Sequence, residues 1–436
     1  MTFKRDRGDR FIVEGGAVLE GCVSVSGAKN AALAMMCAAL LTDEDVTLAN
    51  VPDISDVDSL GELLLELGVT LDRTPGDTIR LNAAGVERLE APASRIAENR
   101  ASFQVTGPLL ARFGEASAPA PGGDSIGQRP IAVHLAGFEA LGARVTRDGQ
   151  RYTVRAGDAR NRGSSRAAGR LRGARVFMDY ASVTGTQNVM MAAVLAEGHT
   201  TIVNAATEPE VQEIARLLNC MGARIEGIGA QVVEIDGVER LHGASWRVMP
   251  DRIEAGTYAI AAAITGGDVL LDDAPVAYMD AVVAKLRAAG AEVRQEGEAR
   301  LRVNGCSEMQ PLSFQALPYP GVPTDIQAPL ATMLTQAHGQ SVVHERVFDD
   351  RLLYISELRK MGADIVGQGS VAYINGPSRL HGTRVRALDI RAGVAVLLAA
   401  LVAEGTTIVE DIYHLDRGYA HLEEKLRALG ADLKRD

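Results

Sequence analysis

The sequence predicts an α/β protein of two similar domains, each built from three repeats of the same kind. Three observations support this prediction. The chain has 436 residues, more than one hydrophobic core usually supports. A leucine-rich phrase that ends on glycine returns six times along the chain. A second, almost wholly apolar stretch precedes that phrase in most of the repeats.

The leucine-rich phrase has the pattern of an amphipathic helix that ends on a glycine and continues into a strand. Its first copy is LLLELGVTL at 63–71, and its last is LRALGADL at 426–433. The glycines recur roughly every 72 residues, so six units account for nearly the whole chain. The six glycines are Gly68, Gly142, Gly222, Gly290, Gly362 and Gly430.

The apolar stretches predict helices that are buried on every side, since they have no polar face. They are NAALAMMCAALL at 30–41, NVMMAAVLAEG at 188–198, TYAIAAAITGG at 257–267 and GVAVLLAALVAEG at 393–405. Each unit is therefore expected to run strand, buried helix, strand, exposed helix, strand. One unit cannot bury its own central helix, whereas three units around a common axis bury three helices beneath three sheets.

Composition narrows the class of protein. Apolar residues make up 47%, charged residues 23% and aromatic residues 4%, and the net charge is −11. These values exclude a disordered chain and the basic, aromatic surface of a nucleic-acid-binding protein. The run at 31–41 is too short to span a membrane and begins too late for a signal peptide. We expect a cytoplasmic protein with no nucleic-acid or membrane partner.

Cysteines and histidines show no metal-binding pattern. The eight histidines contain no pair four residues apart, and the four cysteines are widely separated. We therefore expect no metal site, and reduced thiols that are mostly buried. The cysteines are Cys22, Cys37, Cys220 and Cys306.

Polar residues at the beginning of the buried helices are the candidate site residues. SGAKN at 26–30 places Lys29 and Asn30 where a strand gives way to a helix. An ammonium group at a helix N-terminus suits an anion, although a cap followed by a snorkelling lysine fits the pattern equally well. PTDIQA at 323–328 opens another buried helix with Asp325, which as an N-cap would need no further role.

Arginines stand at further junctions between strands and helices. A single arginine of this kind usually forms a solvated ion pair. Several arginines from different repeats could instead converge between two domains on a multiply charged ligand, because the guanidinium group binds carboxylate and phosphate through two parallel hydrogen bonds. These junctions carry Arg100, Arg351, Asp389 with Arg391, and Arg417.

The stretch PAPGGDSIGQRP at 119–130 sets one carboxylate, Asp124, among prolines and glycines, with Arg129 shortly after it. Proline and glycine disfavour a regular helix or a central strand here, so we expect a loop from Glu115 to Pro130. An aspartate beside glycine is also ordinary turn chemistry, and a solvated turn is the alternative reading.

Seven motifs occur together and in a family order. The chain resembles the UDP-N-acetylglucosamine 1-carboxyvinyltransferases, a family of enolpyruvyl transferases, from FIVEGG at 11–16 to LRALGADL at 426–433. The motifs that carry the resemblance are SGAKNAA, GPLLARFG, PGG-x-SIG-x-RP, NAATEPE, PDRIEAGT, PTDIQA, and IYHLDRGY followed by EEKLRALGA.

The resemblance implies a fold and an arrangement of domains. The expected fold is a two-domain inside-out α/β barrel of six βαβαβ-type repeats, three per domain, known as the EPSP synthase-like fold. One domain would span 27–236 and carry a mobile catalytic loop at 115–130. The other would combine 1–26 with 237–436, and the active site would lie in the cleft between them.

The resemblance also implies a reaction. It is the transfer of the enolpyruvyl group of phosphoenolpyruvate to the 3-hydroxyl of UDP-N-acetylglucosamine, with release of phosphate. It proceeds by addition and elimination through a tetrahedral ketal, needs no cofactor, and opens peptidoglycan synthesis.

Matched motifs imply the roles of individual residues. Lys29, Arg129 and Arg417 would hold phosphoenolpyruvate, with Arg100 and Arg391 nearby. Asn30 and Asp325 would contact the amino sugar, and Asp325 would be the base for the attacking hydroxyl. The nucleotide would contact Arg100, Arg129, Pro130, Ile131, Ala132, Val133, Tyr180, Ala181, Ser182, Val183 and Val347.

The resemblance gives Asp124 a specific role. Most family members carry at this position a cysteine that delivers a proton to the methylene carbon of phosphoenolpyruvate, and some carry aspartate. A carboxyl group, whose ordinary pKa is near 4, can do the same if it is protonated in the closed site. We therefore expect resistance to fosfomycin, which alkylates the thiolate of the cysteine enzymes.

Two departures from the family sequence pattern leave the identity of the enolpyruvyl acceptor open. The family commonly has an acid where this chain has Ala132, and often a basic residue where it has Tyr180. One alternative is an enolpyruvyl transferase that acts on another uridine nucleotide or nucleoside in specialised metabolism. Another is a non-catalytic paralogue that binds a UDP-sugar, which the set of site cations disfavours. The shikimate-pathway relatives normally have Lys-Ser where this chain has Lys29-Asn30, and they rank low.

Overall fold

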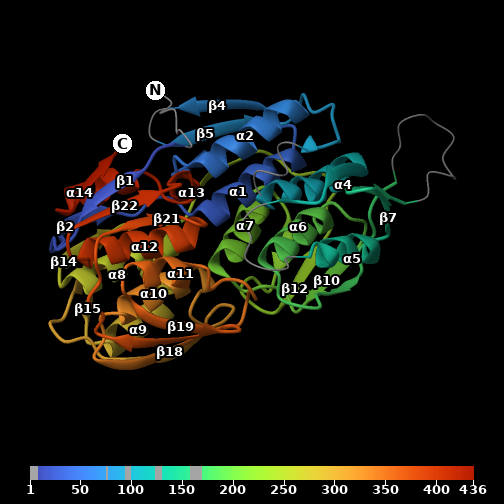
Figure 1. Ribbon diagram of the computed structural model, residues 1–436. Coiled ribbons are helices and arrows are strands. Elements are labelled where there is room, and N and C mark those ends of the chain that lie inside the picture. Colours follow the sequence, from blue (N-terminus) through green and yellow to red (C-terminus); the bar gives the residue numbers. More distant parts are fainter. Residues whose placement is uncertain (1–7, 75–76, 94–99, 123–129, 158–168) are drawn as a thin grey trace.

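Two hydrophobic cores divide the chain into two lobes (Figure 1). The computed structural model describes residues 8–74, 77–93, 100–122, 130–157 and 169–436. The core of the first lobe runs from Ala28 to Met249, with Ala420 added to it. The core of the second lobe combines Phe11–Val25 with Ile253–Leu433. The two-domain α/β organisation predicted from the repeats is confirmed.

One buried helix lies at the centre of each unit, and the apolar stretches predict four of these six helices. In the second lobe the three central helices pack against one another in every pairing. In the first lobe α4 packs on α6, and α1 packs on α6 and on the surface helix α7. The central helices are α1 (Lys29–Ala38), α4 (Thr106–Phe113), α6 (Val183–Ala193), α8 (Arg252–Thr265), α10 (Thr324–Leu334) and α12 (Ile390–Val402).

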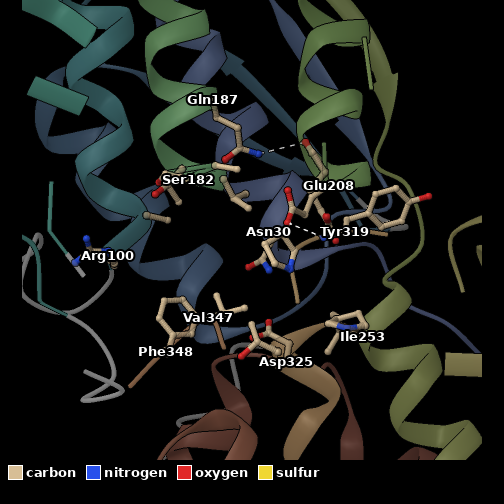
Figure 2. A pocket seen from close by; sticks show the side chains of 18 of the residues that line it. Asn30, Arg100, Ser182, Gln187, Glu208, Ile253, Tyr319, Asp325, Val347 and Phe348 are labelled. Carbon is tan, nitrogen blue, oxygen red and sulfur yellow. Dashed lines mark hydrogen bonds between the residues drawn. The ribbon is translucent and has the colours of Figure 1, made fainter. Parts of the chain in front are cut away.

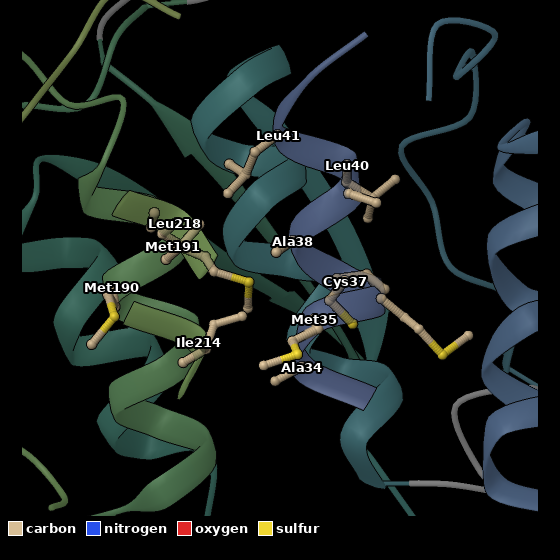
Figure 3. Packing of buried hydrophobic residues seen from close by; sticks show 14 of the residues in the cluster. Ala34, Met35, Cys37, Ala38, Leu40, Leu41, Met190, Met191, Ile214 and Leu218 are labelled. Atoms are coloured by element: carbon tan, nitrogen blue, oxygen red, sulfur yellow. The ribbon is translucent and has the colours of Figure 1, made fainter. Parts of the chain in front are cut away.

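Helix α1 shows why these helices are apolar all round. Every residue from Ala31 to Leu41 is buried, including the 3₁₀ turn η1 (Ala39–Leu41). Figure 3 shows Met35 and Ala38 of α1 in the same cluster as Met191 of α6 and Leu218 of α7. With neighbours on every side, a polar residue in this run would have to be buried, which is costly.

The outer helices follow in each unit and end as predicted. Each is followed by a glycine of positive φ: Gly68, Gly142, Gly222, Gly290, Gly362 and Gly430. Gly68 has φ 104°, and a Cβ there would lie 2.3 Å from the carbonyl oxygen of Gly85. The outer helices are α2 (Ser55–Leu67), α5 (Ala132–Ala140), α7 (Pro209–Cys220), α9 (Asp280–Ala288), α11 (Tyr354–Lys360) and α14 (Leu422–Ala428).

Small sheets cover the central helices. In the first lobe the sheet orders are β13-β3-β5-β4, β6-β8-β7 and β11-β12-β10-β9. Their strands are β3 (Val46–Ala49), β4 (Thr70–Thr74), β5 (Thr78–Asn82), β6 (Glu115–Pro119), β7 (Ala143–Asp148), β8 (Arg151–Ala156), β9 (Arg175–Phe177), β10 (His199–Val203), β11 (Arg224–Glu226), β12 (Val232–Asp236) and β13 (Ala244–Arg247).

The second lobe has the orders β15-β16-β14-β2, β17-β18-β20-β19 and β21-β22-β1-β23. Its strands are β1 (Phe11–Glu14), β2 (Glu20–Ser24), β14 (Asp268–Asp272), β15 (Glu292–Gln295), β16 (Arg300–Asn304), β17 (Ser313–Ala316), β18 (Gly339–Glu345), β19 (Asp364–Gln368), β20 (Val371–Gly376), β21 (Arg384–Arg386), β22 (Thr406–Glu410) and β23 (Asp432–Arg435).

A strand next to each crossing joins a sheet with a strand from a distant part of the same lobe. Strand β2 precedes the first lobe but pairs in parallel with β14 of the second, whereas β13 follows the third unit and pairs in parallel with β3 of the first. The two crossings lie side by side, because Gly27 and Pro250 form an isolated antiparallel bridge. The second crossing therefore lies near residue 250, and the boundary expected at 236–237 is too early.

Two further expectations need correction. The loop expected over 115–130 begins later, because Glu115–Pro119 is strand β6, paired with Arg151–Arg155. Residues 123–129, with Asp124 and Arg129, lie outside the described part of the chain. The cysteines are not mostly buried: Cys37 is buried, but Cys22 and Cys220 are exposed. Among the described residues, no helix is long and apolar enough to cross a membrane.

Candidate active site

A cavity of about 460 Å³ lies between the two lobes, and residues of both line it (Figure 2). Its wall is made by the beginnings of central helices. The residues that contribute to it are Lys29 and Asn30 at α1, Ser182, Val183 and Thr184 at α6, Arg252 and Ile253 at α8, Pro323, Thr324 and Asp325 at α10, and Ile390 and Arg391 at α12. The 3₁₀ turn η2 (Arg100–Val105), which leads into α4, adds Arg100, Ala101 and Gln104.

The convergence of these helix beginnings sets the electrostatics of the cavity. Unpaired backbone N–H groups and the helix dipole make each N-terminus favourable for negative charge. Five cationic side chains add to this potential, against three carboxylates. The cations are Lys29, Arg100, Arg252, Arg351 and Arg391, and the acids are Glu208, Glu210 and Asp325. Such a site suits a ligand with several negative charges.

Asp325 is held by two arginines of its own lobe. Its carboxylate oxygens accept from Arg351 Nη2 at 2.6 Å and from Arg391 Nη2 at 2.8 Å. Burial alone would raise the pKa of Asp325, but Arg391 and Arg351 outweigh burial and hold its pKa well below the usual range. Asp325 is therefore ionised, and it becomes a stronger base only when an arginine is drawn away from it.

Lys29 reaches a second carboxylate, Asp56, which the sequence analysis did not select. The Nζ of Lys29 lies 2.6 Å from Oδ2 of Asp56, and Nε of Arg417 lies 3.0 Å from Oδ1. Arg417 is not among the residues that line the cavity. The structure thus joins the expected pair Lys29 and Arg417 through one shared carboxylate.

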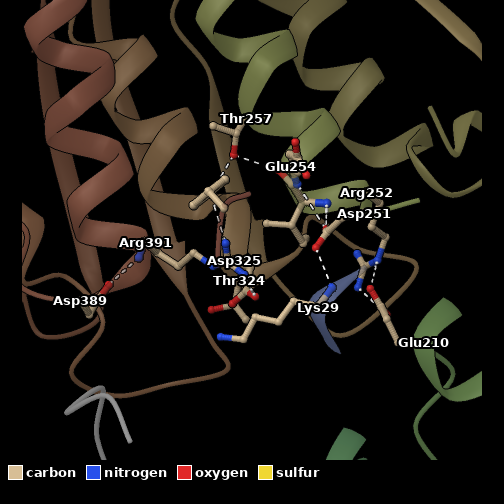
Figure 4. A network of polar contacts seen from close by, with 12 residues as sticks. Lys29, Glu210, Asp251, Arg252, Glu254, Thr257, Thr324, Asp325, Asp389 and Arg391 are labelled. Carbon is tan, nitrogen blue, oxygen red and sulfur yellow. Dashed lines mark hydrogen bonds and ion pairs between the residues drawn. The ribbon is translucent and has the colours of Figure 1, made fainter. Parts of the chain in front are cut away.

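Buried polar contacts fix the helix beginnings in place (Figure 4). Asp251 caps α8 by accepting from the backbone N–H of Ile253 at 2.7 Å, and it also accepts from the backbone N–H of Lys29 at 3.2 Å. Asp389 caps α12 in the same way. Arg252 pairs with Glu210 across the lobes at 2.9 Å, with both side chains almost fully buried. These contacts hold the cavity wall in place before any ligand binds.

His134 lies behind the nucleotide side of the expected site. Burial, and to a lesser extent Arg100, lower its pKa to about 3, so the ring is neutral near pH 7. Asn188 accepts the backbone N–H of Gly107 through Oδ1, which leaves its Nδ2 to donate to Nδ1 of His134 at 3.0 Å. The other ring nitrogen then carries the proton and faces Thr184 at 3.4 Å.

Most of the expected site residues that the structure describes come together in this cavity. They are Lys29, Asn30, Arg100, Pro130, Tyr180, Ala181, Ser182, Val183, Asp325, Val347 and Arg391. Three expected nucleotide contacts do not line it. Ile131 and Val133 are buried at the start of α5, and Ala132 is exposed. The family pattern had placed these three at the ligand, but the helix start turns two of them toward the core.

Several lining residues were not among the predicted site residues. Glu208, Glu210, Arg252 and Thr324 lie in the quoted motifs, whereas Gln187, Tyr319 and Phe348 lie outside them. NAATEPE and PDRIEAGT each carry acids or an arginine where a helix begins, and that position was the available signal. Asp56 had a weaker signal, since two acids in the first turn of α2 are ordinary helix chemistry.

Among the described residues, no group of three or more histidine, cysteine, aspartate or glutamate side chains could hold a metal ion. The arrangement is instead suited to binding anions and to moving protons between carboxylates and a substrate.

Comparison with known proteins gives the family. The EPSP synthase (3-phosphoshikimate 1-carboxyvinyltransferase) family model matches residues 13–426. The UDP-N-acetylglucosamine 1-carboxyvinyltransferase of Magnetococcus marinus is 43% identical over 430 residues, covering 98% of this chain and 99% of the relative. The UDP-N-acetylglucosamine 1-carboxyvinyltransferase 1 of Caldanaerobacter subterraneus subsp. tengcongensis is 44% identical over 427 residues, with the same coverage.

Solved structures show the same fold. The enolpyruvyl transferase NikO from Streptomyces tendae superposes with a TM-score of 0.87 at 25% identity, covering 99% of both chains. EPSP synthase from Acinetobacter baumannii gives a TM-score of 0.75 at 18% identity, covering 98% of this chain and 100% of that one. With 43–44% identity over almost its full length, this chain belongs to the UDP-N-acetylglucosamine 1-carboxyvinyltransferase family.

Proposed function

We propose that the protein transfers the enolpyruvyl group of phosphoenolpyruvate to the 3-hydroxyl of UDP-N-acetylglucosamine and releases phosphate. The observation that carries this proposal is whole-chain identity of 43–45% to transferases named for this reaction. The cavity supports it, because both substrates are multiply anionic and helix N-termini and cations converge there. The product would enter peptidoglycan synthesis in the cytoplasm, and the chemistry requires no cofactor.

The first step is addition. The 3-hydroxyl oxygen forms a bond to C2 of phosphoenolpyruvate while the methylene carbon C3 takes up a proton, which gives the tetrahedral ketal. Asp325 accepts the hydroxyl proton and Asp124 delivers the proton to C3. In the second step C3 returns a proton to the carboxylate of Asp124, the double bond re-forms, and the C2–O bond to phosphate breaks. The proton held by Asp325 leaves with the phosphate. Atoms and charges balance without another reactant.

Ion pairing of Asp325 bears on the first step. A carboxylate held by two arginines is a weak base, so its proton affinity must rise when substrate binds. An anionic group of phosphoenolpyruvate that engages Arg391 would draw this guanidinium from Asp325 and strengthen the base. Asn30, in the same wall of the cavity, would orient the amino sugar.

Anion binding would be shared among Lys29, Arg391 and Arg417, with Arg129 supplied by the stretch at 123–129. Arg100 and the start of α6 at Ser182 and Val183 would serve the nucleotide, with Pro130, Tyr180, Ala181 and Val347 around it. Aspartate in place of the usual cysteine at position 124 would make the protein resistant to fosfomycin, because a carboxylate is a poor nucleophile towards an epoxide.

Phosphate release from phosphoenolpyruvate in the presence of UDP-N-acetylglucosamine tests the proposal. The unmodified chain should turn over, and Asp124→Asn should slow turnover by about 10²- to 10³-fold, as expected for loss of a general acid. Asp124→Cys is the matched variant: it should keep turnover and become sensitive to fosfomycin. Turnover only with another uridine compound would favour an enolpyruvyl transferase with a different acceptor. If no uridine compound causes phosphate release, a non-catalytic paralogue that binds a UDP-sugar is favoured. Rapid inactivation of the unmodified chain by fosfomycin would contradict the role of Asp124.

A further inference from the structure

We propose that Asp56 is a positioning residue for the phosphoenolpyruvate site, holding Lys29 and Arg417 together across the two lobes. The inference rests on the proposed function, because it takes Lys29 and Arg417 as the cations that receive the anionic substrate. Asp56 itself does not line the cavity, so it acts through these two side chains.

The position of Asp56 is fixed by its helix. It is the second residue of α2, and a carboxylate in the first turn is stabilised by the helix dipole. Its side chain is only 4% exposed. Each carboxylate oxygen serves a different cation, Oδ2 the ammonium of Lys29 at 2.6 Å and Oδ1 the guanidinium of Arg417 at 3.0 Å.

The two cations come from different lobes. Lys29 opens α1 in the first lobe, whereas Arg417 follows α13 (Tyr413–Asp416), between Leu415 and Tyr419 of the second core. The neighbouring residue of α2 makes a parallel contact, since Oγ of Ser55 donates to the backbone oxygen of Asp416 at 3.1 Å. The beginning of α2 is therefore bound to the turn that carries Arg417.

The shared carboxylate has two effects on the site. It offsets the repulsion between two like charges, which would otherwise push Lys29 and Arg417 apart and strain the contact between the lobes. The carboxylate of Asp56 also orients the lysine. The ammonium group of Lys29 has three N–H donors, one of which is directed to Asp56, and the lysine side chain lines the cavity. A substrate anion in the cavity then meets a lysine that is already oriented, with Arg417 held beside it by the same carboxylate, which lowers the cost of ordering these side chains.

Asp56→Asn tests the inference, with Asp58→Asn as the matched control. Asp58 lies on the same helix, but its side chain is 34% exposed and pairs with Arg73. In Asp56→Asn, kcat/KM for phosphoenolpyruvate should fall at least tenfold, mainly through KM, while KM for UDP-N-acetylglucosamine stays within twofold. Asp58→Asn should change neither by more than twofold. If the two variants behave alike, or if Asp56→Asn raises both KM values equally, the inference is wrong.

Two further measurements keep the test decisive. Asp56→Glu retains the charge one methylene further out, and its KM for phosphoenolpyruvate should lie between those of the unmodified chain and Asp56→Asn. It also replaces Asp56→Asn as the test variant if that chain fails to fold. If the unmodified chain shows no turnover, the proposed function fails separately, and calorimetric titration with inorganic phosphate then tests Asp56 alone. Phosphate should bind at least tenfold more weakly to Asp56→Asn than to Asp58→Asn, and equal affinities or no binding to either would overturn the inference.

Discussion

Asp325 and Asp56 are two carboxylates that each hold two cations, but they differ in where the cations come from. Arg351 and Arg391 belong, like Asp325, to the second lobe, so this cluster lies within one lobe. Lys29 and Arg417 belong to different lobes, and Asp56 joins them. The side chain of Asp325 is 22% exposed and lines the cavity, whereas that of Asp56 is 4% exposed and lies behind it. The two carboxylates thus differ in exposure and in the origin of their partners, which fits the proposed roles of Asp325 as a base and of Asp56 as a positioning residue.

The largest effect is expected from Asp325→Asn. The amide can still accept from Arg351 or Arg391 but cannot take the hydroxyl proton, so turnover should fall by about 10³-fold. Phosphate release under saturating substrates measures it. Comparable losses in Asp325→Asn and Asp56→Asn would remove the distinction between the two carboxylates.

A smaller effect is expected at Glu210 and Arg252, the other buried pair between the lobes. Glu210→Gln leaves a buried guanidinium without its partner charge, which should lower the free energy of unfolding by about 3 kcal/mol in urea. Replacing both residues, in Glu210→Gln/Arg252→Met, should recover much of that loss because no charge is then left alone. If the losses in the single variants simply add, the two side chains do not depend on each other.

The smallest effect is expected in the pH dependence of the unfolding free energy. Asp325 has a lower pKa in the folded protein than the ordinary value near 4 of an unfolded chain, so its pairing stabilises the fold above that value. This stability is lost as pH falls from about 4 towards the folded pKa. The unfolding free energy of the unmodified chain should exceed that of Asp325→Asn by about 2 kcal/mol at pH 7, and the difference should shrink below about pH 4. A difference that grows in acid would contradict the assignment.

The regular part of the fold could be predicted because local patterns determine it. Helix α12 is apolar on every side, so its burial follows from its sequence alone. The six glycines that follow the outer helices are in the conformation that their position requires. The exposure of Cys22 was not predicted: it lies on the edge strand β2, in which only Val23 is buried.

Residues of the cavity wall could be predicted where a polar residue interrupts an apolar pattern, as Lys29 and Asp325 do. Asp56 could not be found by the same argument, because its neighbours in SDVDSL make it look like one of two acids on a solvated helix start. Its burial comes from Arg417, which lies 361 residues away. Arg417 was selected by its motif, but its distance from the cavity wall depends on how the lobes meet, which no local pattern records.

The paired crossings between the lobes have a mechanical consequence. Gly27 and Pro250 are bridged, the backbone N–H of Ala28 donates to the oxygen of Met249 at 2.7 Å, and that of Asp251 donates to the oxygen of Ser26 at 2.8 Å. A Cβ at position 27 would lie 1.7 Å from the carbonyl oxygen of Asn50, so only glycine fits there. A single connecting segment would allow the two lobes to rotate relative to each other in any direction. Two adjacent segments joined by hydrogen bonds resist twisting, so a relative motion of the lobes would be restricted to bending about one axis.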